Sequence, residues 1–403
     1  MSAAAAALPL ARRWTVLACY ALLAACTQLL WLTFAPIDTA AARTLHADVG
    51  LVGDLAGVFP FVYIALALPT GRWLDRRFVP ALEVGALMTA GGALLRAAFP
   101  TSFGWQLAGQ LVIAGGQPLV LNSINKVAGR YFPATERATA ISIGSVALFV
   151  GVLAAVLTGG PLFALGGLPL VLRVQAVAAV VAAVLAGVAL RTPSTYGGDA
   201  PGSATLGWLA RDRSIWLLAG LVFIGMGTYN AVATWLEPIL QPFGEGGSAG
   251  GLIAVMTAAG IAGAAVLPSP VAARDRRRTM IVSALGLSVA VFAALTVRHE
   301  VRWVGGWLAA EGFLLMACLP VVLDWAEVLA GTERQGAAVG FLLMAGNLGG
   351  VALVLVVQAL IGRPSLALLA LAVVSLAGVP IALGLPARTR GAEARSRSPI
   401  GSG

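Results

Sequence analysis

The stretch LPTGRWLDRR, residues 68–77, ends a long apolar run with a small, charged turn. The same order returns 199 residues later in LPSPVAARDRRR, residues 267–278, where a Leu-Pro pair again leads to an aspartate followed by arginines. Outward from these turns, QPLVLN (117–122) is echoed by LPVVLD (319–324), and Thr-Glu-Arg occurs at 135–137 and 332–334. Matches in one order at similar offsets indicate that a unit of six helices was duplicated.

The composition places both units in a membrane. Hydrophobic residues make up 59% of the 403 residues and charged residues 11%, whereas a soluble domain carries about 25% charged residues. A water-soluble core cannot hide so much apolar surface, so we expect a lipid bilayer around the chain. The net charge of +9 is spread between apolar runs without a basic stripe, which excludes a nucleic-acid-binding protein.

Twelve apolar runs are long enough to cross a hydrocarbon core of about 30 Å, which takes about 20 helical residues. They predict an all-α integral membrane protein with two pseudo-symmetric halves of six transmembrane helices. The runs begin near Trp14, Gly50, Val79, Gly104, Ala138, Leu168, Ser214, Ala249, Thr279, Trp303, Gly336 and Pro364. We expect an N-terminal half over 1–191, a cytoplasmic linker over 192–213, a C-terminal half over 214–386 and a basic cytoplasmic tail over 387–403.

The charges between the runs predict the orientation. With the N-terminus inside, 20 of the 26 lysines and arginines lie on the cytoplasmic side, as the positive-inside rule expects. Both termini are then cytoplasmic. Arg12 and Arg13 precede a run too long for a signal peptide, so we expect a retained first span. A single lysine, Lys126, among many arginines and alanines favours a GC-rich bacterial genome and hence a bacterial inner (plasma) membrane.

Few residues could support catalysis or hold a cofactor. The two histidines, His46 and His299, lie outside the expected spans, and the three cysteines lie in apolar runs without metal-ligand spacing. No GxxxxGK[ST] phosphate loop occurs, so ATP is not expected to drive the protein directly. We expect no enzyme, no cofactor and no metal. The expected partners are a small-molecule substrate and the bilayer, and the chain is expected to be a monomer.

Two six-helix halves with a charged turn after spans two and eight resemble the major facilitator superfamily. Its signature, a glycine followed by an aspartate and paired basic residues, is matched by Gly71, Asp75, Arg76 and Arg77. The resemblance implies alternating access, in which two halves rock about a central site. The turn could be a solvated topology signal or a cytoplasmic latch. Further candidates for the same gating network are Asp275, Arg276, Glu136, Arg137, Asp324 and Glu327.

A narrower resemblance is carried by WLTFAPI (31–37), GQPLVLNS (116–123), ERATAISIG (136–144) and LPVVLDWAEVL (319–329). These stretches are similar to the feline leukaemia virus subgroup C receptor-related transporters, which implies a substrate of the choline, ethanolamine or haem kind. The resemblance implies that Trp31 contacts a cationic head and that Gln117 binds substrate. The chain departs from the pattern where Asn230 replaces a tyrosine and Tyr229 comes one position earlier, a turn of about 100°, and where Asn347 replaces a glutamine.

Polar residues at membrane depth tend to face the interior of a helix bundle. Gln28, Trp31 and Ala35 are spaced to share a face of span one. The Trp31 ring could attract a cation or belong to the interfacial aromatic belt. On span seven, a polar stripe of Asn230, Thr234 and Glu237 could include an outer gate at Glu237 or be solvated there.

Two deeper residues have competing interpretations. Gln117 precedes Pro118, which bends a helix, so its amide could line a binding site or hydrogen-bond a neighbouring helix. Glu311 is expected about 12 Å into span ten. It could carry a proton, meet a cationic substrate, pair with Arg302, or be a neutral structural group.

The sequence therefore predicts a secondary active or facilitative transporter of a small organic solute. A choline-like amine is one candidate substrate. The alternative within transport is a proton-coupled multidrug or metabolite exporter of the same superfamily. The alternative from another class is a membrane sensor or receptor without transport.

Overall fold

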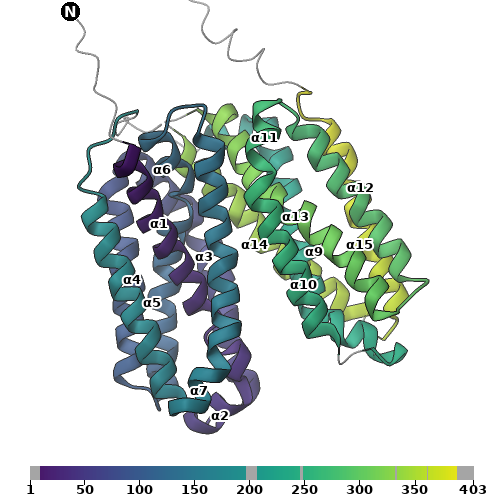
Figure 1. The fold of residues 1–403 in the computed structure, drawn as a ribbon, viewed down its shortest axis with the longest axis horizontal. Helices are drawn as coiled ribbons and strands as arrows, with labels where there is room; N and C mark the ends of the chain where they lie inside the picture. Colours follow the sequence, from purple (N-terminus) through teal and green to yellow (C-terminus); the bar gives the residue numbers. More distant parts are fainter. Residues whose placement is uncertain (1–9, 197–206, 246–247, 332–333, 361, 388–403) are drawn as a thin grey trace, which may run out of the picture. The chain divides into compact units, whose positions relative to one another are not determined.

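The computed structural model describes residues 10–196, 207–245, 248–331, 334–360 and 362–387, and every regular element in these ranges is a helix (Figure 1). Up to residue 196 the helices are α1 (Leu10–Trp31), η1 (Ala35–Ile37), α2 (Asp38–Leu45), α3 (Val49–Arg76), α4 (Phe78–Ala98), α5 (Phe103–Leu121), α6 (Ile124–Tyr131) and α7 (Arg137–Ala189). From residue 207 they are α8 (Gly207–Arg211), α9 (Arg213–Leu240), η2 (Gln241–Phe243), α10 (Ala249–Val266), α11 (Pro268–Ala273), α12 (Arg277–Leu295), α13 (Val301–Ala330), α14 (Gln335–Leu360) and α15 (Pro364–Leu383).

Eleven helices of the described chain are long and apolar enough to cross a membrane. The longest, α7, contains two spans, because Gly166 and Gly167 leave helical geometry. Gly167 has φ 65° and ψ −168°, a combination essentially confined to glycine. Twelve spans result, and each begins within four residues of its predicted start. The prediction of a twelve-helix membrane protein is confirmed.

Large apolar side chains point outward from the long helices. Leu87 on α4, Leu165 and Val177 on α7, and Leu376 on α15 are all more than half exposed. Apolar surface of this kind is unfavourable in water and is the surface that lipid tails cover in a membrane protein.

The helices form two compact units. The first comprises residues 1–206 and 332–344, and the second comprises 207–331 and 345–403. The border after residue 206 falls within the expected linker 192–213, of which 197–206 lie outside the described residues, as does the expected tail from residue 388 on. Unlike the two expected halves, the first unit also takes the start of α14, as far as Met344.

In the first unit, α1 packs along α7, and α4 packs along α5 (Figure 1). A buried cluster around Leu30, Phe59 and Ile113 joins α1, α3 and α5. Helix α1 ends at Trp31, and residues 32–34 turn into η1. The expected continuous face from Gln28 to Ala35 is therefore interrupted, because side chains of α4 and α5 take the last carbonyls of α1.

In the second unit, α10 packs along α13, and α12 packs along α15 (Figure 1). Glycines let α10 and α13 touch backbone to backbone. A Cβ added to Gly263 would collide with the carbonyl of Phe313, and one added to Gly312 would collide with the carbonyl of Met256. Such close approach is typical of helices that associate in lipid, where no hydrophobic drive brings them together.

Candidate functional site

Trp31 is fixed at the last position of α1. Its indole Nε1 donates a hydrogen bond to the carbonyl oxygen of Ala56 on α3 at 2.8 Å, and its ring lies tilted against Phe59 with centroids 6.3 Å apart. The side chain is half-buried. Trp31 is thus held in one orientation with part of its surface free.

Two glutamines of the expected site are buried in the same unit. The Gln28 amide donates to the Thr27 hydroxyl at 3.3 Å on α1. Gln117 lies on α5 before Pro118 and is 5% exposed. Both amides therefore lie in the interior of the first unit.

Arg96 is a buried cation that sequence reasoning placed outside the membrane core. It is 0% exposed on α4, and its Nη1 donates to the Leu30 carbonyl at 3.1 Å and to the side-chain carbonyl of Gln110. Its Nη2 donates to Thr33 at 2.6 Å and to Gln175 at 3.3 Å. All four partners are neutral.

The Arg96 network holds the end of α1. Gln110 also donates to the carbonyls of Trp31 at 3.4 Å and of Leu55 at 3.1 Å, and the Arg96 guanidinium lies 5.3 Å from the centre of the Phe34 ring. A cation and an amide donor at a helix C-terminus satisfy its last carbonyls and oppose its negative dipole. The network therefore positions the residue that the sequence singled out, Trp31.

In the second unit the expected substrate residues lie on three helices. Tyr229 on α9 shares a hydrogen bond of 3.2 Å with Thr257 on α10, and Asn230 lies against Gly350 of α14. Thr234 on α9 is exposed and Asn347 on α14 is half-buried. The side chain of Glu237 lies outside the described residues.

Glu311 is the most buried acid among the described side chains of the second unit. It is 1% exposed on α13, and its Oε1 lies 2.5 Å from the hydroxyl of Ser288 on α12. Its Oε2 is buried without a hydrogen-bond partner among the described residues. The neighbour of Glu311 is thus Ser288, whereas Arg302 is exposed nine positions earlier.

Asp75 lies at the centre of the first gating cluster. Its Oδ1 accepts a hydrogen bond from the Gly336 backbone N–H at 2.8 Å, and its Oδ2 accepts one from Ala337 at 3.0 Å. The ammonium of Lys126 lies 3.0 Å from Oδ1. Gly71 packs against the Gly336 backbone. These contacts all lie within the first unit.

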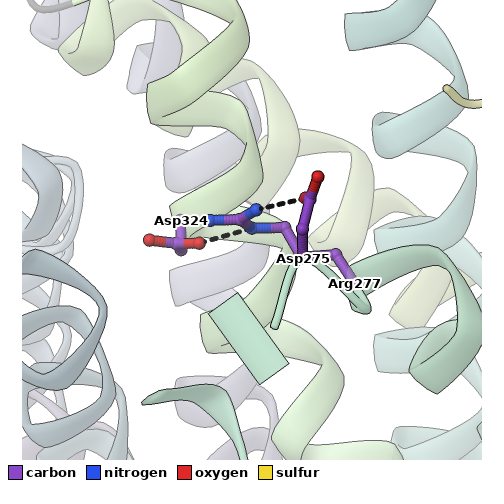
Figure 2. Close-up of polar contacts among 3 residues, drawn as sticks. All are labelled: Asp275, Arg277 and Asp324. Atoms are coloured by element: carbon purple, nitrogen blue, oxygen red, sulfur yellow. Dashed lines mark hydrogen bonds and ion pairs between the residues drawn. The ribbon is translucent and has the colours of Figure 1, made fainter. Parts of the chain in front are cut away.

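The second gating cluster also contains the aspartate of a charged turn, Asp275, but its cation is an arginine, Arg277 (Figure 2). Arg277 donates from Nε to Asp324 Oδ2 at 2.6 Å and from Nη1 to Asp275 Oδ1 at 3.0 Å. Figure 2 shows the guanidinium between the two carboxylates. The buried cation of the RDRRR stretch is therefore Arg277, whereas Arg276 is exposed.

The remaining gating candidates lie apart from these clusters or at their edges. Glu136 pairs with Arg13 at 2.8 Å, and Arg137 donates to the carbonyl of Phe132 at 3.2 Å. Glu327 is buried on α13. Arg76 and Arg77 are exposed at the end of α3.

Known proteins resemble this chain along most of its length. Solute carrier family 49 member A3 of Danio rerio is 31% identical over 275 residues, which cover 64% of this chain and 58% of that protein's length. The Xenopus tropicalis protein of the same name is 25% identical over 379 residues, covering 87% and 78%. The choline/ethanolamine transporter flvcr2b of Danio rerio is 24% identical over 373 residues, covering 84% and 76%.

Solved structures show the same fold. FucP, a Major Facilitator Superfamily transporter, has a TM-score of 0.73 at 14% identity, covering 92% of this chain and 99% of that chain. A bacterial homologue of the iron transporter ferroportin has a TM-score of 0.76 at 12% identity, covering 93% and 98%.

The two expected resemblances are confirmed. The similarity to flvcr2b matches the expected likeness to the feline leukaemia virus subgroup C receptor-related transporters, and the twelve spans match the expected fold. Residues 16–354 match the family described as Major Facilitator Superfamily. This chain therefore belongs to the Major Facilitator Superfamily of membrane transporters.

Proposed function

We propose that this transporter carries a small organic cation of the choline kind across a bacterial inner membrane, with both termini in the cytoplasm and as a monomer. The halves expose one central site to each side in turn. The observation that carries the proposal is the fixed, half-buried Trp31. The printed activity of a relative, a choline/ethanolamine transporter, adds support.

The electron-rich face of a tryptophan binds quaternary ammonium groups through cation–π attraction, worth about 2 kcal/mol when the cation is desolvated. Holding the ring through Ala56 and Phe59 in advance reduces the entropy lost on binding. The amides of Gln28 and Gln117 would accept a hydrogen bond from a substrate hydroxyl or amine. In the second unit, Tyr229, Asn230, Thr234 and Asn347 are proposed to contact the substrate, with Glu311 treated separately below.

The two carboxylate clusters are proposed as the latches of the transport cycle. Asp75 binds the start of α14, which continues from the first unit into the second. Asp324 and Asp275 hold Arg277 within the second unit. An ionised group that is left buried without its partner is strongly unfavourable. We therefore expect each ion pair to be either formed or fully separated, which favours two discrete conformations of the transporter.

The test is uptake of labelled choline into proteoliposomes by the wild type, Trp31→Ala and Trp31→Phe. Losing about 2 kcal/mol of cation–π attraction should raise the KM of Trp31→Ala on the order of 30-fold, and phenylalanine should restore part of it. Trp105→Ala is the matched control, because Trp105 is exposed on α5 and stacked on Phe99. Equal KM values for Trp31→Ala and the control would refute the proposed site.

A proton-coupled exporter of drugs or metabolites is the second candidate, favoured by the buried carboxyl of Glu311. The same vesicles distinguish it: such an exporter would leave choline unmoved but would move a labelled lipophilic cation when a pH gradient is applied. A sensor without transport would move neither.

A further inference from the structure

Glu311 lies in surroundings that offer it one polar contact. Its Oε1 faces the Ser288 hydroxyl at 2.5 Å, and its Oε2 is buried without a partner among the described residues. The Ser288 oxygen also lies 3.1 Å from the carbonyl oxygen of Ala284, one turn earlier on α12. A hydroxyl has a single proton and cannot make a full, well-aligned hydrogen bond to both oxygens at once.

Both contacts of Ser288 become hydrogen bonds if Glu311 is a neutral acid. Protonated at Oε1, the carboxyl donates to the Ser288 oxygen, and Ser288 then donates its own proton to Ala284. With an ionised carboxylate, one of the two contacts is between two acceptors. The geometry of the three groups thus matches the protonated form of Glu311.

The helices packed against α13 carry no compensating cation near Glu311. Helices α10 and α11 contain no charged residue in the described chain. On α12 the charged residues are Arg277 and Arg278; Arg277 lies eleven positions before Ser288, roughly 16 Å along the helix, and already binds Asp324. On α9, Arg213 is the first residue, and the side chain of Glu237 lies outside the described part.

The other titratable groups nearby are neutral or occupied. On α13 itself, Arg302 is exposed about 14 Å away along the helix, and Asp324 and Glu327 lie at the far end. The Cys318 thiol donates to the Leu314 carbonyl, and the Tyr229 hydroxyl is engaged with Thr257. An ionised carboxylate here would be an unpaired buried charge, which is strongly unfavourable.

A metal cation does not suit this place. Hard cations take about six oxygen ligands, whereas Glu311 has one hydroxyl beside it. No group of three or more His, Cys, Asp or Glu side chains that could hold a metal gathers in the described residues. A proton neutralises the carboxyl with no further ligand.

We propose that Glu311 and Ser288 form a proton-binding site whose occupancy is coupled to solute movement. A proton from one side of the membrane binds Glu311 Oε1 and is later released to the other side, which regenerates the carboxylate. This inference rests on the proposed transport function for its coupling, but the proton site itself can be tested without any substrate.

The first experiment is infrared spectroscopy of the full chain in an ester-free detergent at neutral pH. The wild type is expected to show a protonated-carboxyl C=O band that Glu311→Gln lacks, while the other buried acids cancel in the difference spectrum. Ser288→Ala should shift the frequency of this band, because the carboxyl loses its hydrogen-bond partner. Glu300→Gln, an exposed acid just before α13, should leave it unchanged. Absence of a Glu311-dependent band would overturn the proton site.

The second experiment measures labelled choline in proteoliposomes under pH gradients of both signs. For one proton per solute, one pH unit supports an accumulation of about tenfold, and one sign of the gradient should produce it in the wild type. Glu311→Gln should lose this gradient response, measured as the ratio of gradient-driven uptake to exchange, whereas Glu300→Gln should keep it.

The outcomes separate the two proposals. A wild type that moves no choline refutes the choline function, and the infrared result still decides the proton site. A wild type that exchanges choline without responding to either gradient refutes the coupling, even if the band is present. A Glu311→Gln variant that still accumulates choline under a gradient also refutes it.

Discussion

The carboxylate of Asp75 on α3 binds the backbone N–H of Gly336, the second residue of α14, with 2.8 Å between Oδ1 and N. The first N–H groups of a helix have no partner within the helix, and a negative charge is favourable there. Glycine at 336 makes the approach possible, since an added Cβ would lie 2.9 Å from Asp75 Oδ1 and 2.6 Å from the Gly71 carbonyl. The family's charged turn thus acts on a helix 261 residues away in the chain.

Replacing Asp75 with asparagine should destabilise the protein. The change removes the carboxylate of the buried Asp75–Lys126 ion pair, and breaking such a pair by removing one partner costs about 3–5 kcal/mol. We expect a clearly lower melting temperature in detergent, and slower exchange of labelled choline in vesicles. Asp54→Asn is the control, because Asp54 is an exposed acid on the same helix. If both variants melt like the wild type, the Asp75 contacts contribute little to stability.

Arg277 and Asp324 should show strong energetic coupling in a double-mutant cycle. Arg277→Met leaves the buried carboxylate of Asp324 without its cation and should cost about 3–5 kcal/mol, whereas Asp324→Asn leaves Arg277 paired with Asp275 and should cost less. The double variant should lose less than the sum, with a coupling of about 0.5–3 kcal/mol, measured by thermal unfolding. Arg276→Gln, exposed next to Arg277, should change stability by no more than about 0.5 kcal/mol. Additive losses would mean that the pair acts through separate contacts.

The sequence predicted the fold well because length and apolar character determine what can cross a bilayer. Every span began within four residues of its expected position. Even the split of α7 followed from the pattern, since the new run was expected at Leu168, directly after Gly167. The apolar runs could not show that the beginning of α14 belongs to the first unit. That assignment depends on contacts between residues far apart in the sequence.

The sequence predicted less well which polar side chains point into the helix bundle and which residues they contact. Arg96 was counted as an outer topology residue, because one arginine near the end of an apolar run looks the same whether it points to water or inward. The useful signal was in the neighbouring spans, where Gln106, Gln110 and Gln175 supply polar partners at membrane depth. Arg276 and Arg277 differ by one helical position, and only the structure determines which of them turns inward.

The break in α7 should depend on glycine at position 167. Its φ of 65° with ψ −168° costs an L-residue about 1–3 kcal/mol, so Gly167→Ala should lower the melting temperature. Gly160→Ala is the control, because an added Cβ there meets nothing within 4 Å and the backbone is helical. Equal stability of the two variants would show that the turn between the two spans adapts to a side chain.

Arg96→Gln should weaken both the fold and the position of Trp31. The variant removes donors to Leu30, Gln110 and Thr33, and each buried group left without a partner costs about 1–3 kcal/mol. Arg96→Lys keeps the charge but not the planar fork of donors, so it should recover only part of the loss. The measurements are the melting temperature and the KM for labelled choline.

A purely structural role for Arg96 would lower the melting temperature and leave the KM of the surviving protein unchanged. Because Arg96 and Gln110 hold the last carbonyls of α1, we expect KM to rise as well, and to rise less for Arg96→Lys than for Arg96→Gln. Arg302→Gln is the matched control, since Arg302 is exposed at the start of α13 and its loss should change neither quantity. A KM that stays at the wild-type value in Arg96→Gln would separate this network from the substrate site and leave Trp31 oriented by Ala56 and Phe59 alone.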